Sequence, residues 1–239
     1  MFHKIASRLN RLCHRVLARS ATRRQFDLHE LKAAGYYSQC GQDQWVAEVL
    51  CKDSVTKIFV DIGANDGISF SNTCHLERNL GWTGIAVEPI PEVFRKLKAN
   101  RGGILVNACI AAQPGTAKFQ VVSGYAEMLS GLVDEYDPQH QQRIADEIAR
   151  HGGTCREIEV ECCNFNELLD RHGIRKVDYL NIDTEGAEYS ILKTIDFRRF
   201  EISVVGVENN YDDCRIPLLM RKNGYVLHSI VGDEFYVRR

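Results

Sequence analysis

The sequence contains no apolar run that approaches the roughly 18 residues of a membrane-spanning helix, which argues against an integral membrane protein. It also has no C-x-x-C pair, no serine nucleophile elbow and no phosphate-binding glycine loop. Zinc sites built on spaced cysteines, serine hydrolases and P-loop nucleotide hydrolases are therefore excluded. The nine cysteines are an odd number with no secretory signal before them. They predict reduced core thiols and a cytoplasmic protein.

The net charge is close to zero, at −2, but it is unevenly distributed. Residues 1–26 hold seven Lys and Arg and no acid, so the remaining chain carries 23 basic and 32 acidic groups, a balance of −9. Such an acidic body argues against nucleic acid as a partner of the main domain. The length of 239 residues predicts one α/β domain, which we place at residues 36–239 behind an arm of residues 1–35.

Within this arm, apolar residues recur at spacings of three and four, which predicts a helix with one apolar face. The apolar positions are Phe2, Ile5, Leu9, Leu12 and Val16. Lysines and arginines fall on an adjacent sector, a pattern typical of helices that lie on a membrane surface or bind a partner. Three interpretations stay open: peripheral membrane contact through residues 1–26, a helix that only packs outside the domain, and a mitochondrial-type presequence.

The main domain is organised around residues 57–72, where a short apolar run ends in Asp61 and a glycine turn follows. A buried strand that breaks at such a turn and feeds a helix forms the cofactor crevice of open α/β sheets. The turn departs from the dinucleotide fingerprint G-x-G-x-x-G, because Asn65 and Ile68 occupy its second and third glycine positions. Asp66 would also repel a pyrophosphate. A ligand with a cationic end, such as S-adenosylmethionine, fits this turn better.

A second apolar run ends in Glu88, 21 residues after Gly67. A carboxylate at that place can accept both hydroxyls of an adenosine ribose. The alternative is an ordinary βαβ unit whose strands happen to end in acids.

Six blocks of this sequence resemble the FkbM-type methyltransferases, and the resemblance runs from about residue 37 to the last residue. The blocks are SQCGQD, VDIGANDG, FSNT, GWTGIAVEP, DYLNIDTEGAE and VEN, which begin at residues 38, 60, 70, 81, 178 and 207. The resemblance implies a Rossmann-like α/β fold with a mostly parallel seven-stranded sheet, an antiparallel last strand and helices on both faces. It implies S-adenosylmethionine as cofactor, with Ser38 and Gln39 near its methionine end. The expected cofactor-binding residues are Ser38, Gln39, Asp61, Gly63, Ala64, Asn65, Asp66, Gly67, Glu88, Pro89, Cys109, Ile110 and Asp183.

Two later strands also end in acids, Asp183 with Glu185 close behind it, and Glu208. We expect these three side chains to hold the acceptor, directly or through a divalent cation such as Mg²⁺, with Asp183 or Glu185 as base. The alternative is that Asp183 and Glu185 cap a helix and Glu208 is structural. Residues 123–153 interrupt the strand–helix rhythm, and we expect them to form a lid over the acceptor.

The predicted function is therefore methyl transfer from S-adenosylmethionine to a hydroxyl, and the expected acceptor is a sugar or glycan, free or lipid-linked. A nicotinamide oxidoreductase is one alternative, but it would need a glycine at position 65 and a Tyr-x-x-x-Lys pair, and the sequence has neither. The other alternative is a binding module on the same fold without catalysis.

Overall fold

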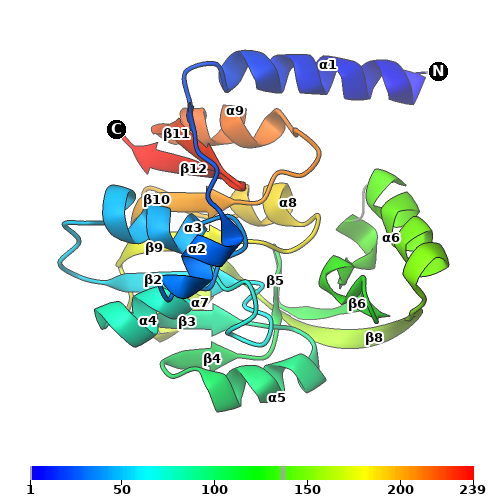
Figure 1. The fold of residues 1–239 in the computed structure, drawn as a ribbon, viewed down its shortest axis with the longest axis horizontal. Helices are drawn as coiled ribbons and strands as arrows, with labels where there is room; N and C mark the ends of the chain where they lie inside the picture. The colour runs from blue at the N-terminus through cyan, green and yellow to red at the C-terminus, as the bar shows by residue number, and fades with distance from the viewer. Residues whose placement is uncertain (1, 136–137) are drawn as a thin grey trace.

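The computed structural model describes residues 2–135 and 138–239, which build one eight-stranded sheet and one smaller sheet (Figure 1). The order of the large sheet is β1-β11-β12-β10-β9-β2-β3-β4. Only β12 runs antiparallel to its neighbours, β10 and β11. The strands are β1 (Thr22–Arg23), β2 (Ile58–Ile62), β3 (Thr83–Val87), β4 (Ile104–Val106), β9 (Lys176–Ile182), β10 (Glu201–Val207), β11 (Tyr225–Val231) and β12 (Asp233–Arg238).

The predicted fold class is confirmed, including the antiparallel last strand. The predicted count of seven strands is wrong by one. The two-residue strand β1 adds an eighth, because Thr22 pairs with Ser229 and Arg23 with Ile230 at the free edge of β11. Two residues carry no periodic signal of their own, so this strand exists only through its long-range partner.

Helices cover both faces of the large sheet, as expected. Side chains alternate between the faces along each strand. Val60 and Ile62 pack with helices α7, α8 and α9, whereas Phe59 packs with α3, η1 and α4 on the other face. Leu97 of α5 packs on Ala86, on the face opposite Ile85 and Val87 of the same strand. The helices are α1 (Phe2–Leu17), α2 (Leu28–Ala33), α3 (Gln42–Trp45), the π-helical η1 (Val46–Leu50), α4 (Cys74–Leu80), α5 (Pro91–Asn100), α6 (Pro138–His151), α7 (Phe165–Arg171), α8 (Glu188–Leu192) and α9 (Arg215–Lys222).

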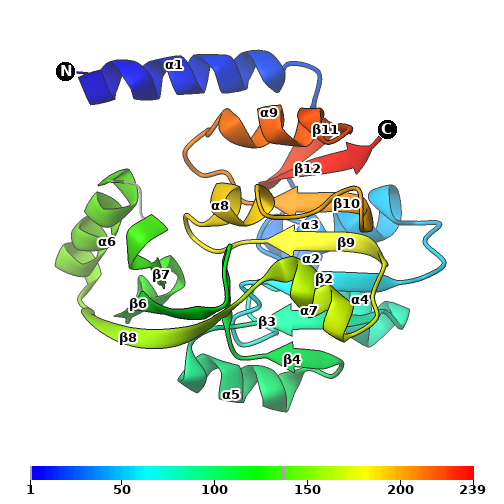
Figure 2. The ribbon, with the colours of Figure 1, turned by 180° about the vertical axis from the view of Figure 1, so that it is seen from behind.

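A second sheet, in the order β5-β8-β6-β7, stands beside the ends of the parallel strands (Figure 2). It consists of β5 (Cys109–Ile110), β6 (Gly115–Ser123), β7 (Gly131–Leu132) and β8 (Thr154–Cys163). Cys109 and Ile110 pair with Cys162 and Cys163 of β8, so they belong to this sheet. The structure describes the insertion of residues 123–153 except for residues 136 and 137. The predicted lid includes these two residues, which lie outside the described part of the chain. It contains the short turns η2 (Glu127–Leu129) and η3 (Val133–Glu135), strand β7 and helix α6.

Helix α1 runs along the β11 and α9 side of the molecule, apart from the second sheet (Figures 1 and 2). Asn10 and His14 of this helix contact the segment before α9, since Asn10 accepts a hydrogen bond from the backbone N–H of Cys214 at 3.0 Å. Among the described residues, no helix combines the length and the apolar character that crossing a bilayer demands.

Candidate active site

Four residues of the site follow directly on four neighbouring parallel strands. Ile62 of β2 is in register with Val87 of β3 and Ile182 of β9, and Ile182 is in register with Val207 of β10. The next residue on each strand therefore lies in one row across the carboxyl edge of the sheet. These residues are Gly63, Glu88, Asp183 and Glu208.

The row is held by backbone hydrogen bonds that extend the sheet by one step. Gly63 donates to the carbonyl of Val87, Asp183 to that of Ile62 and Glu208 to that of Ile182, each at 3.0 Å. A rigid scaffold of this kind fixes functional side chains better than a free loop does.

The turn after β2 needs glycine at position 63 for two reasons. Its φ is +90°, and a Cβ there would lie 1.8 Å from the carbonyl oxygen of Asp183. The side chain of Asp66 then folds the turn, because its Oδ1 accepts the backbone N–H groups of Ile68 and Ser69 at 2.8 and 2.7 Å. Burial alone would raise the pKa of Asp66, but these hydrogen bonds outweigh it and lower the pKa.

Glu88 lies at the end of β3 with its side chain almost fully buried and directed to the same turn. Its two oxygens accept the backbone N–H groups of Ile90 at 2.8 Å and Asn65 at 3.1 Å. Burial nevertheless raises the pKa of Glu88 to about 7. The carboxylate is thus fixed in place and poorly solvated, so further hydrogen-bond donors from a ligand would stabilise its charged form.

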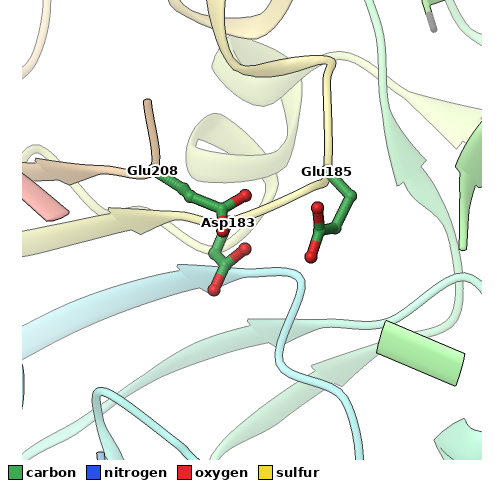
Figure 3. A group of neighbouring side chains, drawn as sticks. All are labelled: Asp183, Glu185 and Glu208. Carbon is green, nitrogen blue, oxygen red and sulfur yellow. The ribbon is translucent and has the colours of Figure 1, made fainter. Parts of the chain in front are cut away.

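Three carboxylates converge where β9 and β10 end (Figure 3). Asp183, Glu185 and Glu208 each offer one oxygen, and these oxygens lie within 4.8 Å of one another. Burial, followed by repulsion from neighbouring acids, raises the pKa of Asp183 and Glu208 well above the usual range. Burial also raises the pKa of Glu185 to about 7, although Arg143 opposes the shift. A cation or a proton between these groups would relieve the repulsion.

Glu185 carries two further signs of a functional position. Its φ is +55°, a left-handed conformation that costs a residue other than glycine roughly 1–2 kcal/mol. Its Oε2 atom is buried and has no hydrogen-bond partner. The nearby Glu188 instead accepts hydrogen bonds from the N–H groups of Thr184 and Gly186, so it organises the turn around Glu185.

The insertion reaches both halves of the site. Met128 accepts a hydrogen bond from the side-chain amide of Asn65, and Arg143 of α6 lies 3.9 Å from Glu185. His140, fully buried at the start of α6, contacts the hydroxyl of Tyr211 and lies 3.8 Å from Glu185.

The loop between β10 and α9 joins distant parts of the molecule. It begins at Glu208, and its Tyr211 contacts His140 of the insertion at 3.0 Å. One residue later, Asp212 forms an ion pair with His14 of α1 at 3.2 Å. The same loop therefore carries a site carboxylate and touches both the insertion and the N-terminal helix.

A cavity of about 890 Å³ opens along the row of strand ends and beneath the insertion. It is lined by most of the residues that the sequence predicted for the site, namely Gln39, Asp61, Gly63, Ala64, Asn65, Asp66, Glu88, Pro89, Cys109, Ile110, Asp183, Glu185 and Glu208. Ser38 and Gly67 are not among the lining residues. Ser38 is buried and donates to Asp43 at 2.5 Å, and a Cβ on Gly67 would strike Arg101 and Leu97. Both therefore support the fold around the cavity.

Sequence reasoning missed a buried polar network in the wall of the cavity. Asn181 donates to Asp61 at 2.9 Å and accepts from Asn72, which also donates to Asp233 at 3.1 Å. The Oδ1 atom of Asn72 is buried without a hydrogen-bond partner, and Asn72 lines the cavity. Asn72 stands in the FSNT block, but no local pattern showed that it meets residues more than 100 positions away.

Comparison with known structures returns methyltransferases, at low similarity. The FkbM methyltransferase of Methylobacillus flagellatus KT is 11% identical, with a TM-score of 0.46, covering 96% of this chain and 59% of that one. A METTL16 methyltransferase domain is 12% identical, with a TM-score of 0.39, covering 81% and 63%. The human METTL16 N-terminal domain in complex with SAH is 14% identical, with a TM-score of 0.39, covering 81% and 66%. This chain thus spans less than two thirds of the first two structures.

No curated protein matches the sequence. The family model described as "Methyltransferase FkbM domain" matches residues 61–227, which include the glycine turn, Glu88 and all three clustered carboxylates. The chain therefore belongs to the FkbM methyltransferase family.

Proposed function

We propose that this protein transfers a methyl group from S-adenosylmethionine to a hydroxyl oxygen of a sugar or glycan. One observation carries the proposal: the glycine turn with Glu88 and the cluster of Asp183, Glu185 and Glu208 line a single cavity. The end of the cavity at the glycine turn and Glu88 suits an adenosyl cofactor. The end at the carboxylate cluster suits an acceptor whose hydroxyl proton must be removed.

The residues present fit the cofactor at three points. Glu88 would accept the ribose hydroxyls, and the buried Ile90 and Ile110 offer an apolar surface to the adenine. The unpartnered Oδ1 of Asn72 would accept a hydrogen bond from the methionine ammonium. When bound, the cofactor supplies an activated methyl on a sulfonium.

The carboxylate cluster would hold the acceptor and receive its proton. A base works best when its pKa is near the working pH, and the raised pKa of Glu185, about 7, meets this condition. Asp183 is the alternative base, since it stands in the row of strand ends next to the turn. Glu208 completes the cluster and would orient the acceptor hydroxyl.

A divalent cation is part of this proposal as a second way to use the same oxygens. A sugar hydroxyl is a weak acid, and a cation bound to its oxygen would lower its pKa. Carboxylate oxygens are the ligands that Mg²⁺ prefers, and three lie close enough to share one ion. Activity measured with and without a chelator separates a cation-assisted reaction from one that uses the carboxylates alone.

Two features favour a carbohydrate acceptor, free or lipid-linked. The acceptor end of the cavity is lined by polar groups such as Glu185, Arg143 and Asn210, which suit a ligand rich in hydroxyls. Tyr125, with 72% of its surface exposed, stands on the insertion among the lining residues. An aromatic ring at that place offers an apolar face with a polar tip to a sugar ring.

Calorimetry with S-adenosylhomocysteine and, separately, NADH tests the cofactor half of the proposal. We expect S-adenosylhomocysteine to bind and NADH not to bind. Glu88→Ala should weaken binding by about tenfold or more, since it removes hydrogen bonds to a charged group. Glu159→Gln, an exposed change on β8, serves as the matched control. Binding of NADH in place of S-adenosylhomocysteine would show an oxidoreductase instead.

Turnover on a panel of nucleotide sugars and glycans tests the reaction itself. Asp183→Asn should retain S-adenosylhomocysteine binding within a few-fold while losing turnover by about 100-fold or more. Cofactor binding without turnover on any acceptor, in the wild type as well, would instead support a binding module without catalysis.

A further inference from the structure

Helix α1 packs on the body of the protein through one side. Asn10 and His14 lie one turn apart on that side, and Ala18 continues their spacing of four just after the helix ends at Leu17; His14 and Ala18 are 4% and 2% exposed. His14 contacts both Glu234 and Asp212, and Asn10 accepts the backbone N–H of Cys214. This line fixes which side of the helix faces the protein.

The opposite side of α1 carries large aliphatic side chains in contact with water. Leu9, Leu12 and Val16 are 62%, 61% and 54% exposed, and their spacings of three and four place them on one stripe. At 100° per residue, this stripe lies roughly opposite the packed line. Single exposed aliphatic residues are ordinary, but an aligned set on one helix marks a contact surface.

Positive charge flanks the exposed stripe. Arg11 and Arg15 lie between the packed line and the stripe, Arg19 follows two residues after the helix ends, and all three are exposed. Arg23 and Arg24 follow, and no acidic residue occurs before Asp27. Any surface that meets the stripe therefore also meets a strongly basic segment of the chain.

We propose that α1 is a membrane-binding helix that lies flat on an anionic lipid surface, with Leu9, Leu12 and Val16 inserted among the acyl chains. Such helices pair a buried apolar stripe with arginines and lysines at headgroup level. The orientation is consistent with the packing, because the Asn10–His14–Ala18 line keeps the protein body on the side away from the lipid. The observations behind this proposal do not depend on the proposed methyl-transfer function.

Two other occupants of this surface fit the residues less well. A nucleic acid would pair with the arginines, but its phosphates would gain nothing from three exposed aliphatic side chains. A second copy of the chain would bring two arrays of arginine together, which is unfavourable at an interface without acids. An anionic bilayer offers acyl chains to the aliphatic stripe and negatively charged headgroups to the arginines.

Vesicle flotation of the full chain tests the proposal. The probes are vesicles of phosphatidylcholine alone and vesicles with about one third phosphatidylglycerol. We expect partitioning to the anionic vesicles only, weakened by salt. The double variant Leu9→Gln/Leu12→Gln should reduce the partition coefficient by about 100-fold, and Arg15→Gln/Arg19→Gln by about 30-fold. Leu218→Gln, an exposed apolar position on α9, is the matched control and should partition like the wild type.

Both double variants change exposed side chains, so circular dichroism should show an unchanged fold. Equal flotation of the wild type and both double variants would overturn the proposal. So would a dimer, measured by light scattering, that the leucine variant dissociates while vesicles bind neither protein. Binding to RNA without binding to anionic vesicles would also refute it.

Discussion

Gly63 lies so close to Asp183 that a Cβ on the glycine would stand 1.8 Å from the carbonyl oxygen of the aspartate. The glycine turn after β2 and the end of β9, where Asp183 lies, are thus in direct backbone contact. Gly63→Ala should cost at least about 3 kcal/mol of unfolding free energy, because the clash adds to the strain of a positive φ.

Gly173→Ala is the matched control for that substitution. Gly173 also has a positive φ, +66°, but a Cβ there would meet nothing within 4 Å. Its cost should be about 1 kcal/mol. Chemical denaturation of both variants measures the difference in unfolding free energy. Equal costs would show that the backbone at Asp183 shifts and relieves the clash.

The buried Glu88 should make stability depend on pH. Its pKa is raised from the ordinary 4.5 to about 7, so the folded state retains a proton that the unfolded state loses. The contribution of Glu88 is therefore fully present below pH 4.5 and is lost as the pH rises through about 7. Over this window, the unfolding free energy of Glu88→Gln should gain about 3 kcal/mol relative to the wild type.

The gain is measured as the change with pH of the difference in unfolding free energy between Glu88→Gln and the wild type. The size of the difference at one pH is not informative, because the glutamine amide also alters hydrogen bonds at every pH. Urea denaturation between pH 4.5 and 7.5 provides the measurement. A difference that does not change with pH would mean that Glu88 titrates normally.

A divalent cation should stabilise the protein through the carboxylate cluster. Asp183, Glu185 and Glu208 repel one another, and a cation between them offsets that repulsion. Millimolar Mg²⁺ or Mn²⁺ should raise the melting temperature by about 2–4 °C for each kcal/mol that the bound cation adds to the unfolding free energy. The rise should be larger at higher pH, where more of the carboxylates are charged. The shift should vanish in Asp183→Asn and persist in Glu159→Gln. A shift of equal size in both variants would place the cation elsewhere.

The docking of α1 should weaken as the pH rises. The hydrogen bond to Glu234 raises the pKa of His14 above 6.5; burial and nearby Arg23 oppose this shift, whereas the charges of Glu234 and Asp212 support it. The stabilisation is therefore complete below pH 6.5 and is lost as the pH rises through the folded-state pKa. Hydrogen exchange of the α1 amides, corrected for intrinsic rates, should show protection falling with pH. In His14→Gln that dependence should disappear, and its persistence would assign the effect to another group.

The strand ends of this site were predictable because each follows a mostly apolar segment, although Asp178 and Asn181 interrupt the segment before Asp183. Such segments are typical of buried parallel strands, so Glu88, Asp183 and Glu208 could be placed at one edge before their register was known. The insertion could also be recognised, since residues 123–153 break the strand–helix rhythm.

The rest depends on contacts between residues far apart in sequence. Ser38 was expected at the cofactor, but its hydroxyl is used by Asp43 inside the fold. The network of Asn72, Asn181 and Asp233 joins three segments that no local pattern connects. The second sheet likewise arises from the pairing of β5 with β8, more than 50 residues later.

The loop that begins at Glu208 has a consequence for how the enzyme would behave in a cell. Through Asp212 this loop is tied to His14 of α1, so a displacement of the N-terminal helix would be passed along the loop to Glu208 in the carboxylate cluster. We expect the enzyme to show interfacial activation, with turnover rising when α1 settles on lipid. Assaying one soluble acceptor with and without anionic vesicles would reveal it, and identical rates would uncouple anchoring from catalysis.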